Sequence, residues 1–151
     1  MTTAALVSQR RGSRAGPRQY PSYTATGLGW IQELPSHWKV RRLKDAVRMN
    51  PDVLGENTDP ELMIRYVDIG NVDSTGQVLD HQEIAFGQSP CRARRLVRSG
   101  DTIISTVRIY LRAIAYVDGS TPNLVVSTGF AVLRPGKDLD GRFLWRLVQS
   151  P

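Results

Sequence analysis

Six arginines in two segments are the side chains with the clearest chemical potential. A guanidinium carries a permanent positive charge and a planar set of donors that can pair with a phosphate or with the acceptor edge of guanine. The two groups are Arg92, Arg94, Arg95 and Arg98 in residues 89–99, and Arg108 and Arg112 further along the chain. The chemistry that these residues offer is the binding of a polyanion rather than a reaction.

The elements that would position these arginines differ. Ser89 before Pro90 is typical of a helix start, so a helix is predicted over residues 89–99, with Arg92, Arg95 and Arg98 on one face. Such a face could meet phosphates by charge, and the alternative is a solvated helix face. Strand structure is predicted over residues 102–117, with Arg108 within and Arg112 just after a β segment, where a projecting arginine could reach a base edge or a phosphate. The alternative there is an ion pair with a neighbouring acid.

Side chains that could catalyse a reaction are sparse. The sequence has no P-loop, no GxGxxG after a strand, no HExxH and no GxSxG elbow. His37 and His81 are expected to have surface or structural roles. The ingredients for a small hydrolase are limited to Asp68, Asp73, His81 and Asp101, which match no spacing motif. We therefore predict no catalytic residue.

Metal and cofactor sites are not predicted either. Residues 68–76 bring Asp68, Asn71 and Asp73 together, but their spacing does not fit a calcium-binding loop, and a β-turn is expected instead. Cys91 is the single cysteine, which excludes an internal disulfide and a cysteine zinc cluster. One cysteine is also typical of a chain from the reducing cytoplasm. No apolar run approaches the ~20 residues that a membrane helix needs.

The positive charge is concentrated at the amino terminus. The net charge is +6, and residues 1–26 hold four arginines and no acid, namely Arg10, Arg11, Arg14 and Arg18. The rest of the chain is therefore only mildly basic, which permits nucleic-acid binding without demanding it. Residues 1–22 are also rich in Ser, Thr, Gly and Pro, so they are interpreted as a flexible basic arm, and residues 23–151 as one folded domain.

Extended segments dominate the predicted domain. Short strands are expected at residues 38–43, 64–69 and 124–135 besides 102–117, with residues 78–79 returning as the hairpin partner of 64–69. Gly129 is expected to be a bulge or a point of close approach. Helical spacing is limited to residues 43–47 and to a short helix that Asp140 can cap. The fold class predicted is α+β, rich in β-strands, with a few short helices.

Four segments carry a resemblance to a known family. They are GLGWIQELPSHWKVRRLKD (27–45), RYVDIGNVDSTGQV (65–78), SGDTIISTVRIYLRAIAYV with VVSTGFAVLRP (99–117 and 125–135), and RFLWRLVQS (142–150). Their order and content resemble the amino-terminal target-recognition domain of type I restriction-modification specificity subunits. The resemblance spans about residues 23–151.

The resemblance implies a domain with a coiled, β-helix-like sheet region that reads one half of a split site in double-stranded DNA. It implies two protein partners, a methyltransferase (modification) subunit and a restriction subunit, which would carry the cofactors and the catalysis; this chain would bind no cofactor. Scaffold roles are implied for Trp30, Pro35, Trp38, Gly100, Asp101 and Gly129. Within this interpretation we expect Arg108 and Arg112 to read bases, and Arg92, Arg94, Arg95 and Arg98 to contact phosphates.

Two departures from the family pattern leave alternatives open. Specificity subunits carry two recognition domains joined by long helices, whereas this chain shows one domain and no long helical pattern. The chain could therefore be a fragment, a half-subunit or an orphan domain that binds DNA as a decoy or regulator. A β-rich protein-interaction module is the alternative outside DNA binding, and it predicts binding that salt does not weaken.

Overall fold

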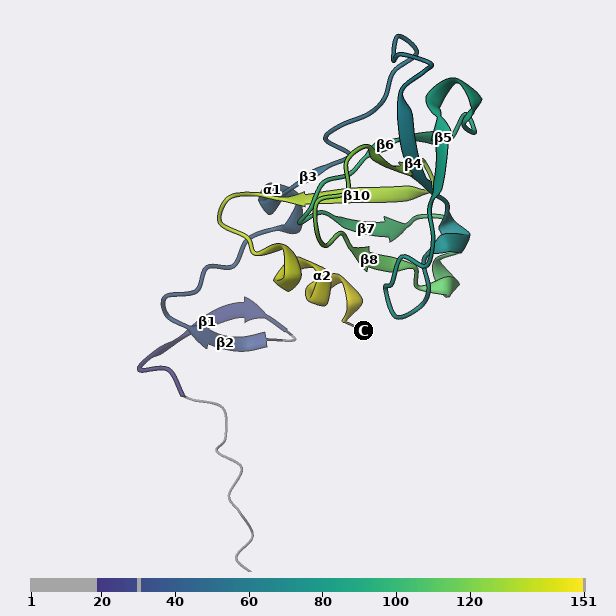
Figure 1. The fold of residues 1–151 in the computed structure, drawn as a ribbon. Helices are drawn as coiled ribbons and strands as arrows, with labels where there is room; N and C mark the ends of the chain where they lie inside the picture. The colour runs from purple at the N-terminus through teal and green to yellow at the C-terminus, as the bar shows by residue number, and fades with distance from the viewer. Residues whose placement is uncertain (1–18, 30, 151) are drawn as a thin grey trace, which may run out of the picture. The chain divides into compact units, whose positions relative to one another are not determined.

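The computed structural model describes residues 19–29 and 31–150, so Trp30 and most of the predicted basic arm lie outside the described residues. These residues divide into two compact units with the boundary between Val40 and Arg41. Their elements comprise ten strands and two α-helices, joined by short 3-10 turns (Figure 1). The predicted β-rich class with a few short helices is confirmed.

The first unit contains one hairpin. β1 (Tyr23–Leu28) pairs antiparallel with β2 (Ile31–Pro35), and the register shifts between Ala25 and Leu28, where Gly27 has a φ of 71°. The expected scaffold residue Pro35 is buried, whereas Trp38 is 49% exposed, its ring packing on Tyr20 and His37. The strand predicted over residues 38–43 is wrong. All side chains of residues 38–43 are exposed. Because the segment has no buried face to specify a register, it pairs with no described strand.

Two four-stranded sheets make up the second unit. The first has the order β3-β10-β7-β8 and the second the order β5-β4-β9-β6. All neighbours are antiparallel except β4 and β9, which are parallel. The strands are β3 (Val47–Met49), β4 (Met63–Val67), β5 (Gln82–Ala85), β6 (Ala93–Leu96), β7 (Thr102–Ser105), β8 (Ile114–Tyr116), β9 (Leu124–Ser127) and β10 (Phe130–Pro135). α1 (Leu43–Ala46) precedes β3, and α2 (Gly141–Gln149) follows β10.

The core has one cluster on each face of the second sheet. Because side chains alternate along a strand, Val67 and Val126 face the first sheet, where they join Ile103, Phe130 and Val132. The residues on the opposite face form a second cluster, namely Ile64, Tyr66, Phe86, Ala93 and Val125. α2 packs on β8 and buries Leu144 completely. As predicted, Asp140 caps this helix by accepting a hydrogen bond from the Phe143 N–H at 2.8 Å.

Four predicted elements differ from the structure because long-range pairing overrides local pattern. The helix predicted over residues 89–99 is instead the strand β6, which pairs with β9. β4 pairs with β5 and β9, while Val78 bridges only Val72. Residues 107–109, expected within a β segment, lie instead in the turn between β7 and β8. Residues 124–135 form two strands, which belong to different sheets.

Gly129 sits where the chain crosses from β9 in one sheet to β10 in the other. A Cβ on this residue would lie 2.5 Å from Cδ1 of Ile69 and 3.6 Å from Oγ of Ser127. The predicted close approach at Gly129 is therefore confirmed, and it brings the segment after β9 against the segment after β4.

Candidate nucleic-acid interface

Three loops meet at one end of the two sheets, which we call the loop end. They are residues 68–71 after β4, 128–129 after β9 and 106–112 after β7. Both the N–H and the Oγ1 hydroxyl of Thr106 donate to the Gly129 carbonyl, at 2.8 and 2.9 Å. Gly129 in turn packs on Ile69. The loop end is thus built by contacts between segments that are distant in sequence.

Residues 106–112, the tip loop, have an unusual backbone. Arg108 and Arg112 flank the 3-10 turn Ile109–Leu111, and both adopt left-handed conformations with φ of 55° and 50°. A residue with a Cβ rarely adopts this conformation, and such strain persists only where surrounding contacts impose it. Hydrogen bonds from the N–H of Leu111 to the Arg108 carbonyl and from the N–H of Arg112 to the Ile109 carbonyl close the turn. The tip loop is therefore a defined structure that presents two arginines.

Residues 73–77 form a fourth loop beside the tip loop. The Asp73 carboxylate accepts hydrogen bonds from the N–H groups of Thr75 and Gln77, which makes the predicted turn. A depression of about 450 Å³ is lined by Ser74, Thr75, Arg112, Ile114 and Gln149. The Arg112 guanidinium donates a hydrogen bond to the carbonyl of Gln149, the last residue of α2, at 3.1 Å. Arg112 is thus tethered, whereas none of the ion pairs and side-chain hydrogen bonds of the described residues involves the Arg108 guanidinium.

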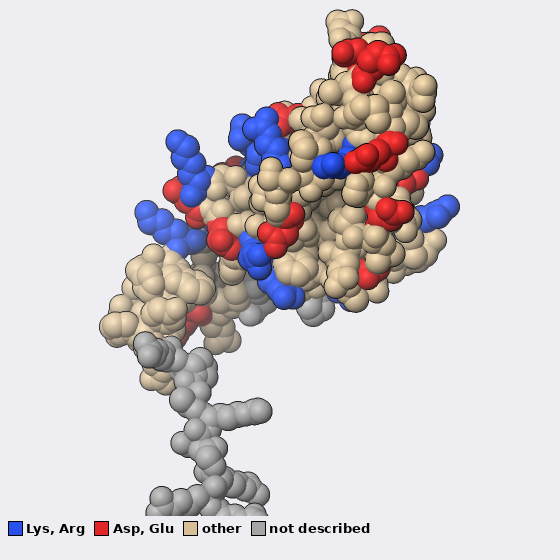
Figure 2. All heavy atoms as spheres, viewed as in Figure 1, with Lys and Arg blue, Asp and Glu red and all other residues tan. Residues whose placement is uncertain are grey.

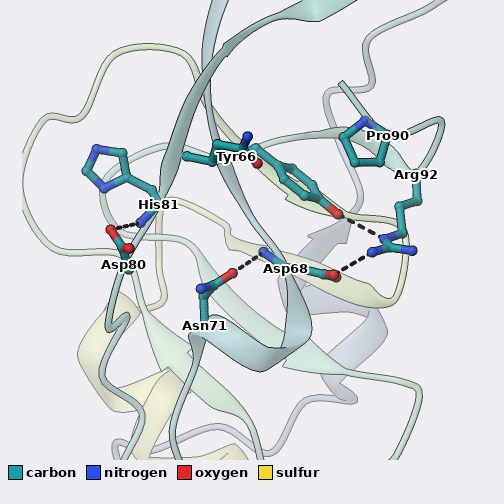
Figure 3. Close-up of a pocket in the computed structure, with 8 residues that line it drawn as sticks. Tyr66, Asp68, Asn71, Asp80, His81, Pro90 and Arg92 are labelled. Carbon is teal, nitrogen blue, oxygen red and sulfur yellow. Dashed lines mark hydrogen bonds and ion pairs between the residues drawn. The ribbon is translucent and has the colours of Figure 1, made fainter. Parts of the chain in front are cut away.

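A second depression, of about 480 Å³, lies beside the loop after β4 (Figure 3). Tyr66, Asp68 and Arg92 point toward one another along one side of it: the Arg92 guanidinium donates to the Tyr66 hydroxyl at 3.0 Å and to the Asp68 carboxylate at 2.6 Å. Asp80 and His81 lie across from them, and Asn71 closes a capping box with Asp68. The walls of this depression thus carry hydrogen-bond donors and acceptors, and they include both acidic and basic side chains.

The contacts in this depression set the charge of its residues. Burial by itself raises the pKa of Asp68, but the Ile69 N–H and Arg92 outweigh burial, so the pKa of this carboxyl lies below its ordinary value. Hydrogen bonds to Tyr66 and Asp68 raise the pKa of Arg92. Asp68 is therefore an anion at neutral pH, which compensates the charge of Arg92.

Comparisons with known proteins agree with this geometry. No family model and no curated protein matches the chain. The crystal structure of the HsdS subunit from Thermoanaerobacter tengcongensis matches 79% of this chain, with a TM-score of 0.69 and 33% sequence identity. A second structure, from work on complex assembly and conformational transition of the type I R-M system, matches 78% of this chain, with a TM-score of 0.67 and 35% sequence identity. This chain has the fold of an HsdS recognition domain.

The resemblance to type I specificity subunits is thus confirmed at the level of fold and sequence. The chain spans only 30% of the length of each of the two HsdS-related chains. The ligands and partners of those longer proteins are therefore only proposed for this HsdS-like chain.

The HsdS-like fold separates the arginines that the sequence grouped together. Arg92, just before β6, lies at the loop end, since the N–H of Thr128 donates to its carbonyl at 2.8 Å. Arg94 stacks 4.9 Å from the Phe86 ring centroid, and burial lowers the pKa of Arg95. Arg98 follows β6 at the opposite end and pairs with Asp52 at 2.9 Å. A strand, unlike the predicted helix, gives these residues no common face, and only Arg92 joins Arg108 and Arg112.

A buried ion cluster at that opposite end was missed in the sequence. The Arg134 side chain, 11% exposed, donates to both carboxylate oxygens of Asp101 at 2.8 Å, and to Asp52 at 2.6 Å. Asp101 is 1% exposed and also accepts the Arg98 N–H. The implied scaffold role of Asp101 therefore has a physical cause, since it joins β7 to β10 and to the loop before β4. The signal in the sequence was the acid Asp101, which stands directly before the β-rich segment that begins at residue 102.

Stability is expected to fall in acid because of these carboxylates. Hydrogen bonding and charge from Arg134 hold the pKa of Asp52 below its ordinary value of 3.8, and the pKa of Asp68 is lowered as well. A carboxyl with a lowered pKa in the folded state stabilises the fold above its unfolded pKa, and this contribution is lost as the pH falls through the folded value. Urea unfolding should give a constant free energy from about pH 7 to 5 and a decline below about pH 4.

The variant Asp68→Asn serves as the control for this acid response. Its amide keeps the side-chain oxygen that accepts the Ile69 N–H, yet removes the titrating group. Its acid decline should be shallower than that of the parent chain. An identical decline in both would contradict the assignment to Asp68, and a loss complete by about pH 5 would contradict the role of both carboxylates.

The residues considered for a hydrolase do not converge. Asp68 and His81 line one depression, but Asp73 is occupied by the turn and Asp101 lies in the ion cluster at the other end of β7. Among the described residues no group of three His, Cys, Asp or Glu side chains could hold a metal ion. None of the helices in residues 19–29 and 31–150 has the length and apolar character to cross a membrane.

Proposed function

We propose that this chain reads double-stranded DNA in a sequence-specific manner for a type I restriction-modification complex, and that it recognises one half of a split site. The observation that carries the proposal is the loop end of an HsdS-like fold, whose joined loops carry Arg92, Arg108 and Arg112. Guanidinium groups on separate loops of one rigid scaffold can contact phosphates and base edges along one duplex.

The distribution of acidic residues supports binding at this end. Three exposed acids, Glu56, Asp59 and Glu61, occupy the loop before β4, and Figure 2 shows acidic side chains gathered there. That loop precedes β4, whereas the loop end follows it, so the acidic loop lies at the opposite end of the strand. Phosphates would be repelled from the acidic loop and attracted to the tip loop. Residues 102–117, which comprise the tip loop and the flanking strands β7 and β8, contain no acid.

The roles of the six arginines follow from their contacts. We assign base reading first to Arg108, whose guanidinium is not held by any described side chain, and then to Arg112, which a duplex would have to release from Gln149. Arg92 is assigned to a phosphate because it lies at the loop end and its side chain, although paired with Asp68, is 54% exposed. Arg94, Arg95 and Arg98 keep the proposed phosphate role only as a long-range charge, since each is occupied or half-buried.

The proposal includes partners. In a type I complex the methyltransferase (modification) and restriction subunits would catalyse the reactions, and the HsdS-like chain would recognise the target DNA sequence. We propose that the complex acts in the cytoplasm, where the DNA lies. Residues 1–22 are proposed to be a basic arm and residues 23–151 the recognition domain. The hairpin β1-β2, which forms a unit of its own, would be the part of that domain nearest the arm.

Selection from a random duplex pool tests the proposal. The purified chain is mixed with the pool at ~50 and ~200 mM salt, and the retained duplexes are sequenced. We expect enrichment of a short motif and a steep loss of retention at the higher salt, because released counterions drive phosphate binding. Arg108→Gln should weaken binding of the enriched duplex by about 10-fold or more, since a base contact is worth about 1–3 kcal/mol.

Arg142→Gln is the matched control. It removes one equal charge from an exposed arginine that pairs with Asp118 at the start of α2, at the far end of that helix from Gln149. It should leave both the motif and the affinity within about twofold. Retention of duplexes with no enriched motif would contradict sequence-specific reading. No retention at either salt concentration would favour the protein-interaction module. The exposed apolar tip loop would then be part of its protein-binding surface.

A further inference from the structure

The most exposed apolar side chains of the second unit lie together on the tip loop. Ile109 is 74% and Tyr110 is 75% exposed, and the flanking Val107 and Leu111 are 50% and 40% exposed. Single exposed apolar residues are ordinary on protein surfaces, but four in five consecutive positions are not. An apolar tip of this kind marks a surface that binds another molecule.

Hydrogen bonds fix the backbone of the tip loop before any partner arrives. The left-handed Arg108 and Arg112 turn the backbone sharply on both sides, so Ile109 and Tyr110 occupy the apex between two arginines. Thr106 ties the base of the loop to Gly129, and the Ser105 N–H donates to the Ala113 carbonyl at 2.9 Å. A rigid loop loses little conformational entropy on binding, which favours its use as a contact element.

The surrounding charge identifies the partner as a polyanion. Arg108 and Arg112 border the apolar apex. Of the acids on the adjoining loops, Asp68 pairs with Arg92, while Asp73 and Asp80 accept backbone N–H groups within their own loops. An apolar apex flanked in the chain by two arginines matches a DNA groove, in which phosphates line both rims and the bases form the floor. A basic or purely apolar protein surface would match this pattern less well.

We infer that Ile109 and Tyr110 are specificity-determining residues that enter the major groove and contact the base edges, while the neighbouring arginines contact the rims or bases beside them. The apolar feature of the major-groove edge is the C5-methyl group of thymine, so the apex recognises an A·T pair through that methyl group. This inference rests on the proposed DNA-reading function, and it names the part of the site that contributes apolar specificity.

The double variant Ile109→Ala/Tyr110→Ala tests the inference, using the full chain and the duplex enriched in the selection above. Affinity is measured at two salt concentrations for the enriched duplex, for a scrambled duplex, and for a series in which each thymine of the enriched duplex is replaced in turn by uracil. The control variant is Phe143→Ala, which truncates an apolar side chain of α2 that is 53% exposed. Circular dichroism and urea unfolding confirm that all three proteins are folded.

We expect the parent chain to lose about 5- to 10-fold in affinity when uracil replaces thymine at one position of the motif. The double variant should be insensitive to that replacement, and its preference for the enriched over the scrambled duplex should fall about 10- to 100-fold, as loss of a base contact predicts. Its salt dependence should be unchanged, because no charge is removed. Phe143→Ala should behave as the parent chain does.

Other outcomes separate this inference from the proposed function. If the double variant keeps the motif, the preference and the uracil response, the apex does not contact bases and the inference is overturned, while DNA reading stands. Equal weakening on all duplexes would also overturn it, because the apex would then contact only the DNA backbone. If the parent chain itself selects no motif, the proposed function fails and the inference fails with it.

Discussion

Replacing Arg134 with methionine is expected to lower the free energy of unfolding by about 3–5 kcal/mol, the usual effect of removing one partner from a buried ion pair. Methionine fills most of the same volume, so the loss would come from charge rather than from a cavity. Asp101, which is 1% exposed, would keep its hydrogen bond from the Arg98 N–H but lose both bonds from the guanidinium. Urea unfolding at neutral pH measures the change.

Arg142→Met is the control for this stability experiment. Its ion pair with Asp118 is exposed on both sides, with 66% and 70% of the side-chain surfaces accessible, so its loss should cost about 1 kcal/mol or less. The double variant Arg134→Met/Asp101→Asn should recover part of the stability, because it no longer buries an unpaired carboxylate. A loss below about 1 kcal/mol in Arg134→Met would show that the cluster is not a structural joint.

Gly76→Ala is expected to be the most disruptive small substitution in the loop end. Gly76 has a φ of 84°, and an added Cβ would collide with the backbone carbonyl oxygen of Ile114 while meeting Trp145 Cζ2 at 3.3 Å. The left-handed conformation costs an alanine about 1–2 kcal/mol, and overpacking against a rigid backbone adds about 1–3 kcal/mol. Unfolding experiments should show the sum, and hydrogen exchange should quicken at the Thr75 and Gln77 amides.

Gly119→Ala separates the two contributions. Gly119 also has a positive φ, 76°, yet a Cβ there would meet nothing within 4 Å. Its replacement should therefore cost only the conformational part, about 1–2 kcal/mol. Equal losses in the two variants would show that the contact of the 73–77 loop with β8 and α2 contributes nothing to the fold.

The two variants also bear on DNA binding. The 73–77 loop and Arg112 line the same depression, and Arg112 is held on Gln149. Displacing this loop would loosen one wall of the proposed interface without removing any charge. Gly76→Ala would then weaken DNA selectivity, whereas Gly119→Ala would not, which ties the rigidity of the loop end to its proposed role.

Several features could be predicted from the sequence because their causes are local. The β-rich class follows from the density of β-branched residues, and the cap of α2 follows from Asp140 placed before an amphipathic segment. The turn at Asp73 follows from an Asp, Ser, Thr and Gly run. Gly129 was recognised because a glycine inside a strand pattern marks a close approach of two segments.

The candidate site depended more on contacts between distant segments. Local pattern placed Arg92 and Arg98 on one helix face, but pairing of β6 with β9 made the segment a strand and sent them to opposite ends. The left-handed Arg108 and Arg112 lie in a stretch whose composition favours β-strand. A conformation that is strained for these residues cannot be predicted from their own preferences, because neighbouring segments impose it.

By itself, the sequence determined the fold class, the Asp140 cap of the short helix α2 and the resemblance to specificity subunits, since these depend on residue type and on spacing over a few positions. Only the tertiary structure decided that Arg92, Arg108 and Arg112 share one end, that Arg134 locks Asp52 to Asp101, and that Ile109 and Tyr110 are exposed. The physical reason is that pairing of β4 with β9, and of β7 with β10, brings together residues separated by many positions in the chain, and local sequence preferences carry no record of which partners will meet.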